Sequence, residues 1–270
     1  MHLGEIVALL ENKLSPKSYS IKDDFYGLQF GESYYNRSIK KIMLTLRLTL
    51  DSIHHAYMKR VNLIISYRGL INKPILSFNQ DLINKLALLS RFPILVFVLN
   101  SSFIGAEGGL SDTIMELLYF ELDRPFLIKN DDGMDIPVGR ICLPKNYFDQ
   151  RKSLKLEDLL KRIKSNLELK IINFVGDLKK SIHKICVIGG DFSDLVVLED
   201  VLKSGCDCYI SNKIAEDQSA RAQDLGINLI EIPGYYFEIK TMKKLSNFLS
   251  LEFPDDEIFL YNTSNLVRNY

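Results

Sequence analysis

The chain has 270 residues, of which 47% are hydrophobic and 10% aromatic, and its 34 Lys and Arg residues balance 34 Asp and Glu residues. This length suits two domains, and the hydrophobic content excludes a disordered chain. A formal net charge of zero gives no support for nucleic acid or an anionic membrane as a partner, so such binding would need a local patch, and it does not oppose self-association.

The N-terminal residues 1–13 place Glu5 and Glu11 among apolar positions. This pattern predicts an amphipathic helix and not a signal peptide. No apolar run reaches the roughly 18–20 residues that a membrane span needs. We therefore expect a cytoplasmic protein.

The first half of the chain alternates predicted strands and helices, followed by a helix running to Leu118 with Ser111 or Asp112 as its N-cap. This βαβαβ pattern is typical of a parallel sheet covered by helices. The strands are predicted at 41–46, 62–66 and 93–99, and the helices between them at 50–60 and 81–90.

The second half reads as another α/β unit after a turn cluster at 130–133. We place the domain boundary just before this cluster, which gives an N-terminal α/β domain at 1–124 and a C-terminal α/β domain at 125–270. The fold class is α/β, with a ligand cleft expected between the domains. In this half, helices are predicted at 156–167, 194–204, 217–225 and 240–249, and strands at 182–188, 208–211 and 227–232.

Gly189 and Gly190 join a predicted strand to a predicted helix, and two interpretations stay open. Backbone N–H groups there would bind an anion at the helix N-terminus, or the glycines would serve a tight turn that needs positive φ. The third glycine of a dinucleotide motif and the lysine of a P-loop are missing.

The cysteines and the paired histidines do not form a recognisable metal motif. Cys206 and Cys208 have a one-residue spacer, whereas zinc pairs usually have two to four residues between them. We expect these two thiols, with those of Cys142 and Cys186, to be buried. His54 and His55 point about 100° apart on a predicted helix, so a solvated helix face is the alternative to a metal role.

Seven segments in order resemble those of the NIF-three-like family, whose members are also called GTP cyclohydrolase type 2 homologues. Residues 24–31 (DFYGLQFG) resemble the family's WDNVGLQVG, and residues 62–74 (NLIISYRGLINKP) resemble its DLIISHHPLIFKP. The other matching segments are 108–112, 139–141, 175–177, 187–190 and 205–210. The resemblance implies two α/β domains, a cleft lined by two metal ions, and a toroidal hexamer.

The chain departs from this family at the positions that the resemblance assigns to the metal ligands. Tyr67 and Arg68 replace two histidines, Ile104 replaces a bridging aspartate, and Tyr235 and Ile239 replace a histidine and a glutamate. These five side chains are not metal ligands of the usual kinds. We therefore predict no bound metal and no cofactor.

Neighbouring positions also differ from the family. A shift of one residue would bring Glu238 to the glutamate position, but a single carboxylate cannot hold a metal pair. By the same resemblance, Arg47 replaces an aspartate, and Asn100 and Asp217 replace histidines.

Two interpretations of the arginines stay open. Arg47 and Arg68 would bind a phosphate-containing ligand if they face the cleft, with Tyr67 and Tyr235 offering hydroxyls or a ring face. Alternatively, they pair with carboxylates such as Asp217 or Glu238 and fill an abandoned cavity.

We therefore expect a non-catalytic binding or scaffold protein that assembles with itself. The alternative is a hydrolase of the GTP cyclohydrolase type 2 kind with an altered or metal-free site. In that enzyme Arg68, Asn100, Tyr235 and Asp217 would line an open cleft. A cleft filled by hydrophobic side chains would exclude it, the candidates being Ile104, Phe237 and Ile239.

Overall fold

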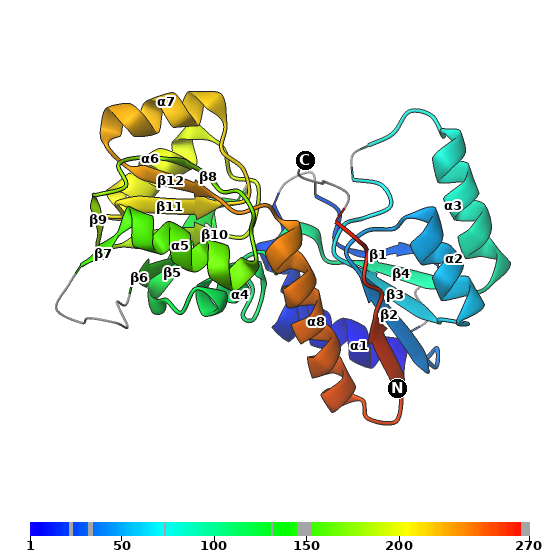
Figure 1. Cartoon of the computed structure of the whole chain (residues 1–270). Helices are drawn as coiled ribbons and strands as arrows, with labels where there is room; N and C mark the ends of the chain where they lie inside the picture. Colours follow the sequence, from blue (N-terminus) through cyan, green and yellow to red (C-terminus); the bar gives the residue numbers. More distant parts are fainter. Residues whose placement is uncertain (22–23, 32–34, 73, 131, 145–152, 266–270) are drawn as a thin grey trace. The chain divides into compact units, whose positions relative to one another are not determined.

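The structure, a computed structural model, describes residues 1–21, 24–31, 35–72, 74–130, 132–144 and 153–265. The chain forms two compact units (Figure 1). Unit 1 combines Met1–Gly108 with residues 238–265, and unit 2 is formed by Gly109–Phe237. The predicted α/β class is confirmed.

Unit 1 contains a five-stranded sheet with the order β1-β4-β3-β2-β13. Strands β4, β3, β2 and β13 are parallel, and β1 is antiparallel to β4. Figure 1 shows α2 and α3 on one face of this sheet, with α1 and α8 on the other. In chain order the elements are α1 (Leu3–Leu9), a π-helix (Leu10–Leu14), a 3-10 helix (Lys17–Tyr19), β1 (Gly27–Phe30), β2 (Lys41–Thr45), α2 (Leu50–Met58), β3 (Leu63–Ser66), α3 (Gln80–Arg91), β4 (Leu95–Val98), a 3-10 helix (Asn100–Phe103), α8 (Tyr235–Glu252) and β13 (Glu257–Leu260).

The central strands of unit 1 are nearly all apolar because helices cover both of their faces. All residues of β3 and β4 are buried. Met43, Ile64 and Val96 pack together with Ile53 and Leu89 from α2 and α3. The predicted βαβαβ pattern is confirmed in this part of the chain.

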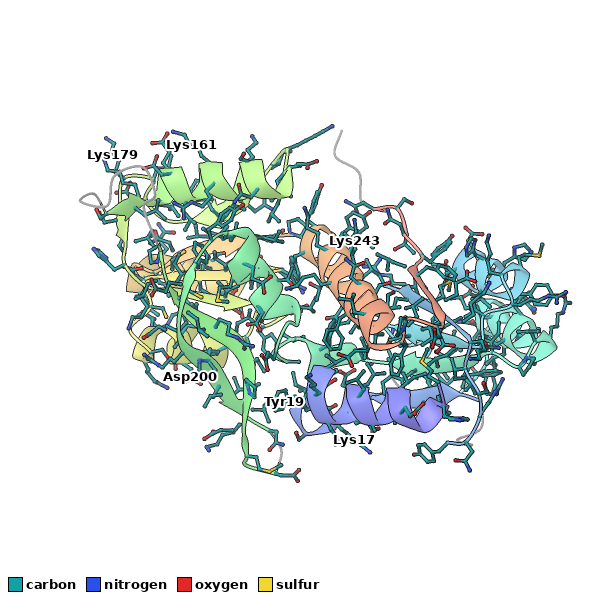
Figure 2. All side chains as sticks on the ribbon, turned by 90° about the horizontal axis from the view of Figure 1, so that it is seen from below. Lys17, Tyr19, Lys161, Lys179, Asp200 and Lys243 are labelled. Carbon is teal, nitrogen blue, oxygen red and sulfur yellow. The ribbon has the colours of Figure 1, made fainter. Side chains whose placement is uncertain are left out.

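Unit 2 contains a six-stranded sheet with the order β5-β6-β10-β11-β12-β8, and a two-stranded sheet of β7 and β9. The charged side chain of Lys161 on α5 points away from the sheet (Figure 2). In chain order the elements are α4 (Leu110–Leu117), β5 (Glu121–Lys129), β6 (Asp135–Leu143), β7 (Leu154–Lys155), α5 (Leu156–Leu167), β8 (Asn173–Val175), β9 (Ser181–Ile182), β10 (Ile185–Ile188), α6 (Leu195–Lys203), β11 (Cys208–Ser211), α7 (Glu216–Leu225) and β12 (Asn228–Glu231).

The division of the chain differs from the boundary drawn at residues 124 and 125. Arg124 lies inside β5, which pairs with β6 along an antiparallel hairpin. The chain then returns to unit 1, where β13 pairs with β2. Unit 1 is therefore discontinuous in sequence, because its sheet is completed by a strand from the C-terminal part of the chain.

Local corrections concern α4 and Gly189. Helix α4 begins at Leu110 after Gly109, so neither Ser111 nor Asp112 is its N-cap. The buried hydroxyl of Ser111 instead donates to the Val138 carbonyl at 2.8 Å and accepts from the Gly189 N–H at 3.0 Å. That N–H is thus not free to bind an anion.

The expected reason for the glycine pair is also wrong, because neither Gly189 nor Gly190 has a positive φ. Gly189 is required by close packing. A Cβ atom there would lie 2.5 Å from the Leu110 Cβ and 2.8 Å from the Leu110 backbone carbon.

All four cysteines are buried and free, as predicted. Burial raises the pKa of the Cys206 thiol to about 11, so it stays protonated at neutral pH. His55 is not on a solvated face, because its ring lies 4.9 Å from that of Tyr261. In the described part of the chain, no helix is both long and apolar enough to cross a membrane.

Candidate functional site

The residues singled out from the sequence are divided between the two units. Arg47, Tyr67, Arg68, Asn100 and Ile104 belong to unit 1. Unit 1 also holds Glu238 and Ile239 from α8, whereas Asp217 and Tyr235 belong to unit 2. Within unit 1, the structure brings Arg68, Tyr67 and Glu238 together.

Strand β3 fixes the position of Tyr67 and Arg68. Both residues follow its last residue, Ser66, and continue its backbone pairing with β2. The Tyr67 N–H donates to the Thr45 carbonyl and the Arg68 N–H to the Leu46 carbonyl, each at 3.0 Å. Side chains at the carboxyl end of a parallel strand commonly form ligand sites in α/β folds.

Arg68 and Glu238 form an ion pair between β3 and α8. The Arg68 Nη2 lies 3.0 Å from the Glu238 Oε1. The Glu238 side chain is only 1% exposed, whereas that of Arg68 is 41% exposed. The Glu238 Oε2 and the Arg68 Nε are buried and have no hydrogen-bond partner among the described residues. The two side chains therefore neutralise each other through one contact.

Tyr67 supports the guanidinium group from one side. The Arg68 Cζ lies 5.0 Å from the centre of the Tyr67 ring, within the range of a cation–π contact. Burial raises the pKa of Tyr67; the charge of Arg68 opposes this shift, and Glu238 and Asp24 add to it. The phenol is therefore neutral at physiological pH and provides no phenolate for a metal ion or a proton transfer.

Two more predicted positions have structural contacts. Asn100 has a left-handed backbone with φ of 42°, and its Nδ2 donates to the Phe25 carbonyl at 2.7 Å. Its backbone N–H donates to the Tyr67 carbonyl at 2.8 Å. Ile104 is buried in the core of unit 1. Ile104, which the resemblance assigns to the bridging metal ligand, thus serves packing, whereas Asn100 serves hydrogen bonding.

Gln29 and Asp24 are structural residues of the site that sequence reasoning missed. The Gln29 Oε1 accepts from the Leu70 N–H at 2.6 Å, and its Nε2 donates to the Ile71 carbonyl at 2.7 Å. This contact holds the loop after Arg68. The Asp24 Oδ2 accepts from the Ser101 N–H at 2.7 Å. Their only sequence signal was the resemblance of residues 24–31 to the family segment.

The remaining candidates are described within their own units. Arg47 is exposed and makes no ion pair within the described residues. Asp217 lies in the first turn of α7 and accepts from the Gln218 N–H at 2.8 Å. The Tyr235 ring packs edge-on against Tyr236 at 5.9 Å. Ile239 is half-buried, and Phe237 is fully buried.

The described ranges contain no group of three or more His, Cys, Asp or Glu side chains placed to hold a metal ion. Glu238, one residue before the mapped position Ile239, has the carboxylate that comes closest to serving as a metal ligand. Its neighbour at hydrogen-bond distance is a cation of the protein itself, Arg68.

Comparison with known proteins gives consistent matches over the whole length. A family model described as Duf34/NIF3 (NGG1p interacting factor 3) matches residues 1–265. Among curated proteins, a GTP cyclohydrolase 1 type 2 homolog from Clostridium perfringens is 24% identical, covering 96% of this chain and 95% of that protein. One from Methanocaldococcus jannaschii is also 24% identical, over 93% of this chain and 95% of that protein.

Solved structures share the fold. Reduced HcgD from Methanocaldococcus jannaschii has a TM-score of 0.78 at 24% identity, covering 97% of this chain and 98% of that chain. A Staphylococcus aureus protein has a TM-score of 0.81 at 19% identity, covering 100% and 99% of the two chains.

Proposed function

The chain belongs to the Duf34/NIF3 family, and from this premise we propose that it is a non-catalytic binding or scaffold protein with a degenerate metal site. The observation that carries the proposal is the Arg68–Glu238 ion pair. It places a permanent positive charge of the protein beside the carboxylate of Glu238, which a shift of one residue would bring to a mapped ligand position.

Electrostatics argue against a divalent cation beside this pair. Burial lowers the pKa of Arg68, but Tyr67, Glu238 and Asp24 together raise this pKa by more than burial lowers it. The guanidinium therefore keeps its charge. A divalent cation about 4 Å from the guanidinium would meet a repulsion of roughly 8 kcal/mol from it at an effective dielectric constant of about 20, which cancels most of the attraction of the Glu238 carboxylate at a similar distance. Exposure of Arg68 to water reduces this figure, and the missing histidine ligands provide nothing to offset it.

The alternative, a hydrolase with a metal-free site, has less support. Such an enzyme needs a titratable group poised near neutral pH. Tyr67 is held neutral, and the Asn100 amide is engaged with a backbone carbonyl. Neither side chain is available as a general base.

An activity assay tests the non-catalytic claim. GTP turnover should equal the protein-free blank in the presence of zinc, manganese or iron. The Glu238→Gln variant and the matched control Glu252→Gln, an exposed residue on the same helix, should give the same rate. Metal-dependent turnover that Glu238→Gln lowers tenfold, and Glu252→Gln leaves intact, would reinstate the hydrolase.

Arg47 is a better candidate than Arg68 for the contact with the predicted phosphate-containing ligand. Glu238 already pairs with Arg68 and neutralises its charge, so the guanidinium offers an incoming phosphate little net attraction. Arg47 is exposed and has no ion pair among the described residues, and the fork of an arginine matches the geometry of a phosphate.

Calorimetric titration with GTP separates the two arginines. We expect Arg47→Gln to weaken binding at least fivefold and Arg68→Gln to leave it within twofold of wild type. Absence of binding heat in the wild type, or a loss confined to Arg68→Gln, would reject Arg47 as the phosphate contact. The hexameric ring implied by the family resemblance stays a prediction.

A further inference from the structure

The part of α8 that belongs to unit 1 carries charge of one sign on its outer side. Residues 239–251 include Lys240, Lys243 and Lys244 and contain no Asp or Glu, although the whole chain has a formal net charge of zero. Lys243 is exposed, and Lys240 and Lys244 are half-buried. Neither Lys240 nor Lys243 forms an ion pair within the described residues. Their charges are therefore available to an external anion.

Helix spacing gathers these lysines on the side of α8 that faces away from the core. Successive residues turn by about 100°, so positions 240, 243, 244, 247, 248 and 251 share one outward arc of less than half a turn. The opposite arc packs into unit 1 through Met242, Leu245 and Leu249, which are buried. Figure 2 shows α8 beside α1, with Lys243 labelled on α8.

A fourth lysine and two apolar side chains extend the same outer side. Lys13 is exposed and lies on the π-helix that follows α1, and its Nζ is 5.5 Å from the centre of the Phe248 ring. Phe248 is half-buried, and Leu251 at the end of the arc is 81% exposed. The surface that we call the α8 face consists of Lys13, Lys240, Lys243, Lys244, Phe248 and Leu251.

We propose that the α8 face binds the surface of a membrane that contains anionic lipids. The negative potential of such a surface attracts nearby lysines, and apolar side chains beside them enter the boundary between headgroups and acyl chains. Binding of this kind places a protein on the membrane and needs no helix that crosses it. The inference does not depend on the proposed lack of catalysis.

The composition of the α8 face favours lipid over nucleic acid. Single-stranded nucleic acid binds through aromatic rings on which its bases stack, whereas the Phe248 ring is half-buried and lies beneath Lys13. Leu251 would lose contact with water at the acyl-chain boundary, and a phosphate backbone offers it no apolar partner. The positive charges are all lysines, whereas arginine is the residue best suited to specific phosphate contacts in nucleic acid.

Co-sedimentation with lipid vesicles tests the proposal. At about 0.1 M salt, phosphatidylcholine vesicles with about 30% phosphatidylserine should bind the wild type, and pure phosphatidylcholine vesicles should not. Each lysine near the surface contributes about fivefold to binding, so Lys240→Gln combined with Lys243→Gln should weaken it at least tenfold. The control Lys164→Gln combined with Lys170→Gln removes two exposed lysines of unit 2 and should keep wild-type binding.

Three results would overturn the proposal. The first is wild-type protein that does not sediment, or that sediments equally with and without phosphatidylserine. The second is an equal loss of binding in the two double variants, because the general charge of the protein would then be the cause. The third is a wild type that binds single-stranded DNA of about 30 nucleotides but no vesicles, since the face would then belong to nucleic acid.

Chemical acetylation of lysines in the wild type maps the contact without any variant. Vesicles with phosphatidylserine should slow the acetylation of Lys13, Lys240 and Lys243 at least threefold, because these amines would face the lipid. Lys164 and Lys170 should react at the same rate with and without vesicles. Unchanged acetylation of Lys240 and Lys243 in protein that sediments would place the contact elsewhere and contradict the proposal.

Discussion

Arg68 and Glu238 lie 170 positions apart in the sequence and meet at 3.0 Å in unit 1. Removing one partner leaves a buried charge, so Arg68→Met should lower the free energy of unfolding by about 2 kcal/mol. This is below the roughly 3–5 kcal/mol of fully buried pairs because Arg68 is partly exposed. The double variant Arg68→Met with Glu238→Met should return to within about 1 kcal/mol of wild type.

Urea denaturation of the single and double variants measures this coupling. The surface pair of Lys161 with Glu157 supplies a control, and Lys161→Met should hardly change the stability. Additive losses in the Arg68 and Glu238 variants would mean that the two side chains do not act as a pair.

Tyr67 makes stability depend on alkaline pH. Burial raises its folded-state pKa above the unfolded value of about 10. Its contribution is therefore complete below pH 10 and is lost as the pH rises from there toward the folded pKa. Tyr67→Phe should reduce the fall in unfolding free energy above pH 10 by up to about 1.4 kcal/mol per pH unit.

Denaturation curves at pH 8, 10 and 11 check this slope. Tyr35→Phe is the control, since the Tyr35 side chain is exposed and does not belong to the core. Identical slopes for wild type and Tyr67→Phe would show that Tyr67 ionises as easily in the folded state as in the unfolded state.

At the scale of elements, the contact between α4 and the end of β10 depends on Gly189. An added Cβ would overlap the Leu110 backbone, so Gly189→Ala should lower the unfolding free energy by about 2 kcal/mol or more. Gly108→Ala, where φ is +70° but the space is open, should cost only about 1 kcal/mol. Equal losses in thermal unfolding would indicate that close packing is not the reason for Gly189.

Buried elements were predictable from sequence, and edge elements were not. The helices and parallel strands have apolar runs or stripes because they are covered, and most of their predicted ranges match closely. The strand predicted at 182–188 is instead two strands, β9 and β10, in different sheets, and the helix predicted at 240–249 begins at Tyr235. The β5–β6 hairpin was missed because β5 is exposed along its first five residues and both strands contain proline. Strand β13 was missed because it is short and pairs with β2, whose last residue, Thr45, lies 212 positions before Glu257.

The candidate site was predictable only in part. The resemblance placed Tyr67, Arg68 and Ile104 by motif, and one of the two open interpretations named Glu238 as a partner for an arginine. The choice of Glu238 depended on three-dimensional contact, because it lies 170 positions from Arg68 in the sequence. The Gln29 and Asp24 side chains accept hydrogen bonds from backbone N–H groups. Such contacts do not require a particular residue type at the partner position, so the sequence shows no pattern for them.

At the scale of the whole molecule, the discontinuous unit 1 predicts how fragments behave. Residues 109–237 contain all strands of their sheet and should fold alone. Residues 1–124 lack β13 and the buried face of α8, so β2 would expose an apolar edge and the fragment should not fold. Circular dichroism and thermal unfolding of both fragments check this. A cooperative transition in 1–124 would contradict the division of the chain.

The central claim is that the protein carries no metal pair, and elemental analysis by inductively coupled plasma mass spectrometry tests it most directly. Untagged protein is incubated with zinc, manganese and iron and then desalted. We predict less than about one-tenth equivalent of each metal, since a structured transition-metal site survives desalting. About two equivalents per chain, lost in Glu238→Gln, would contradict the account and restore a metal-dependent hydrolase.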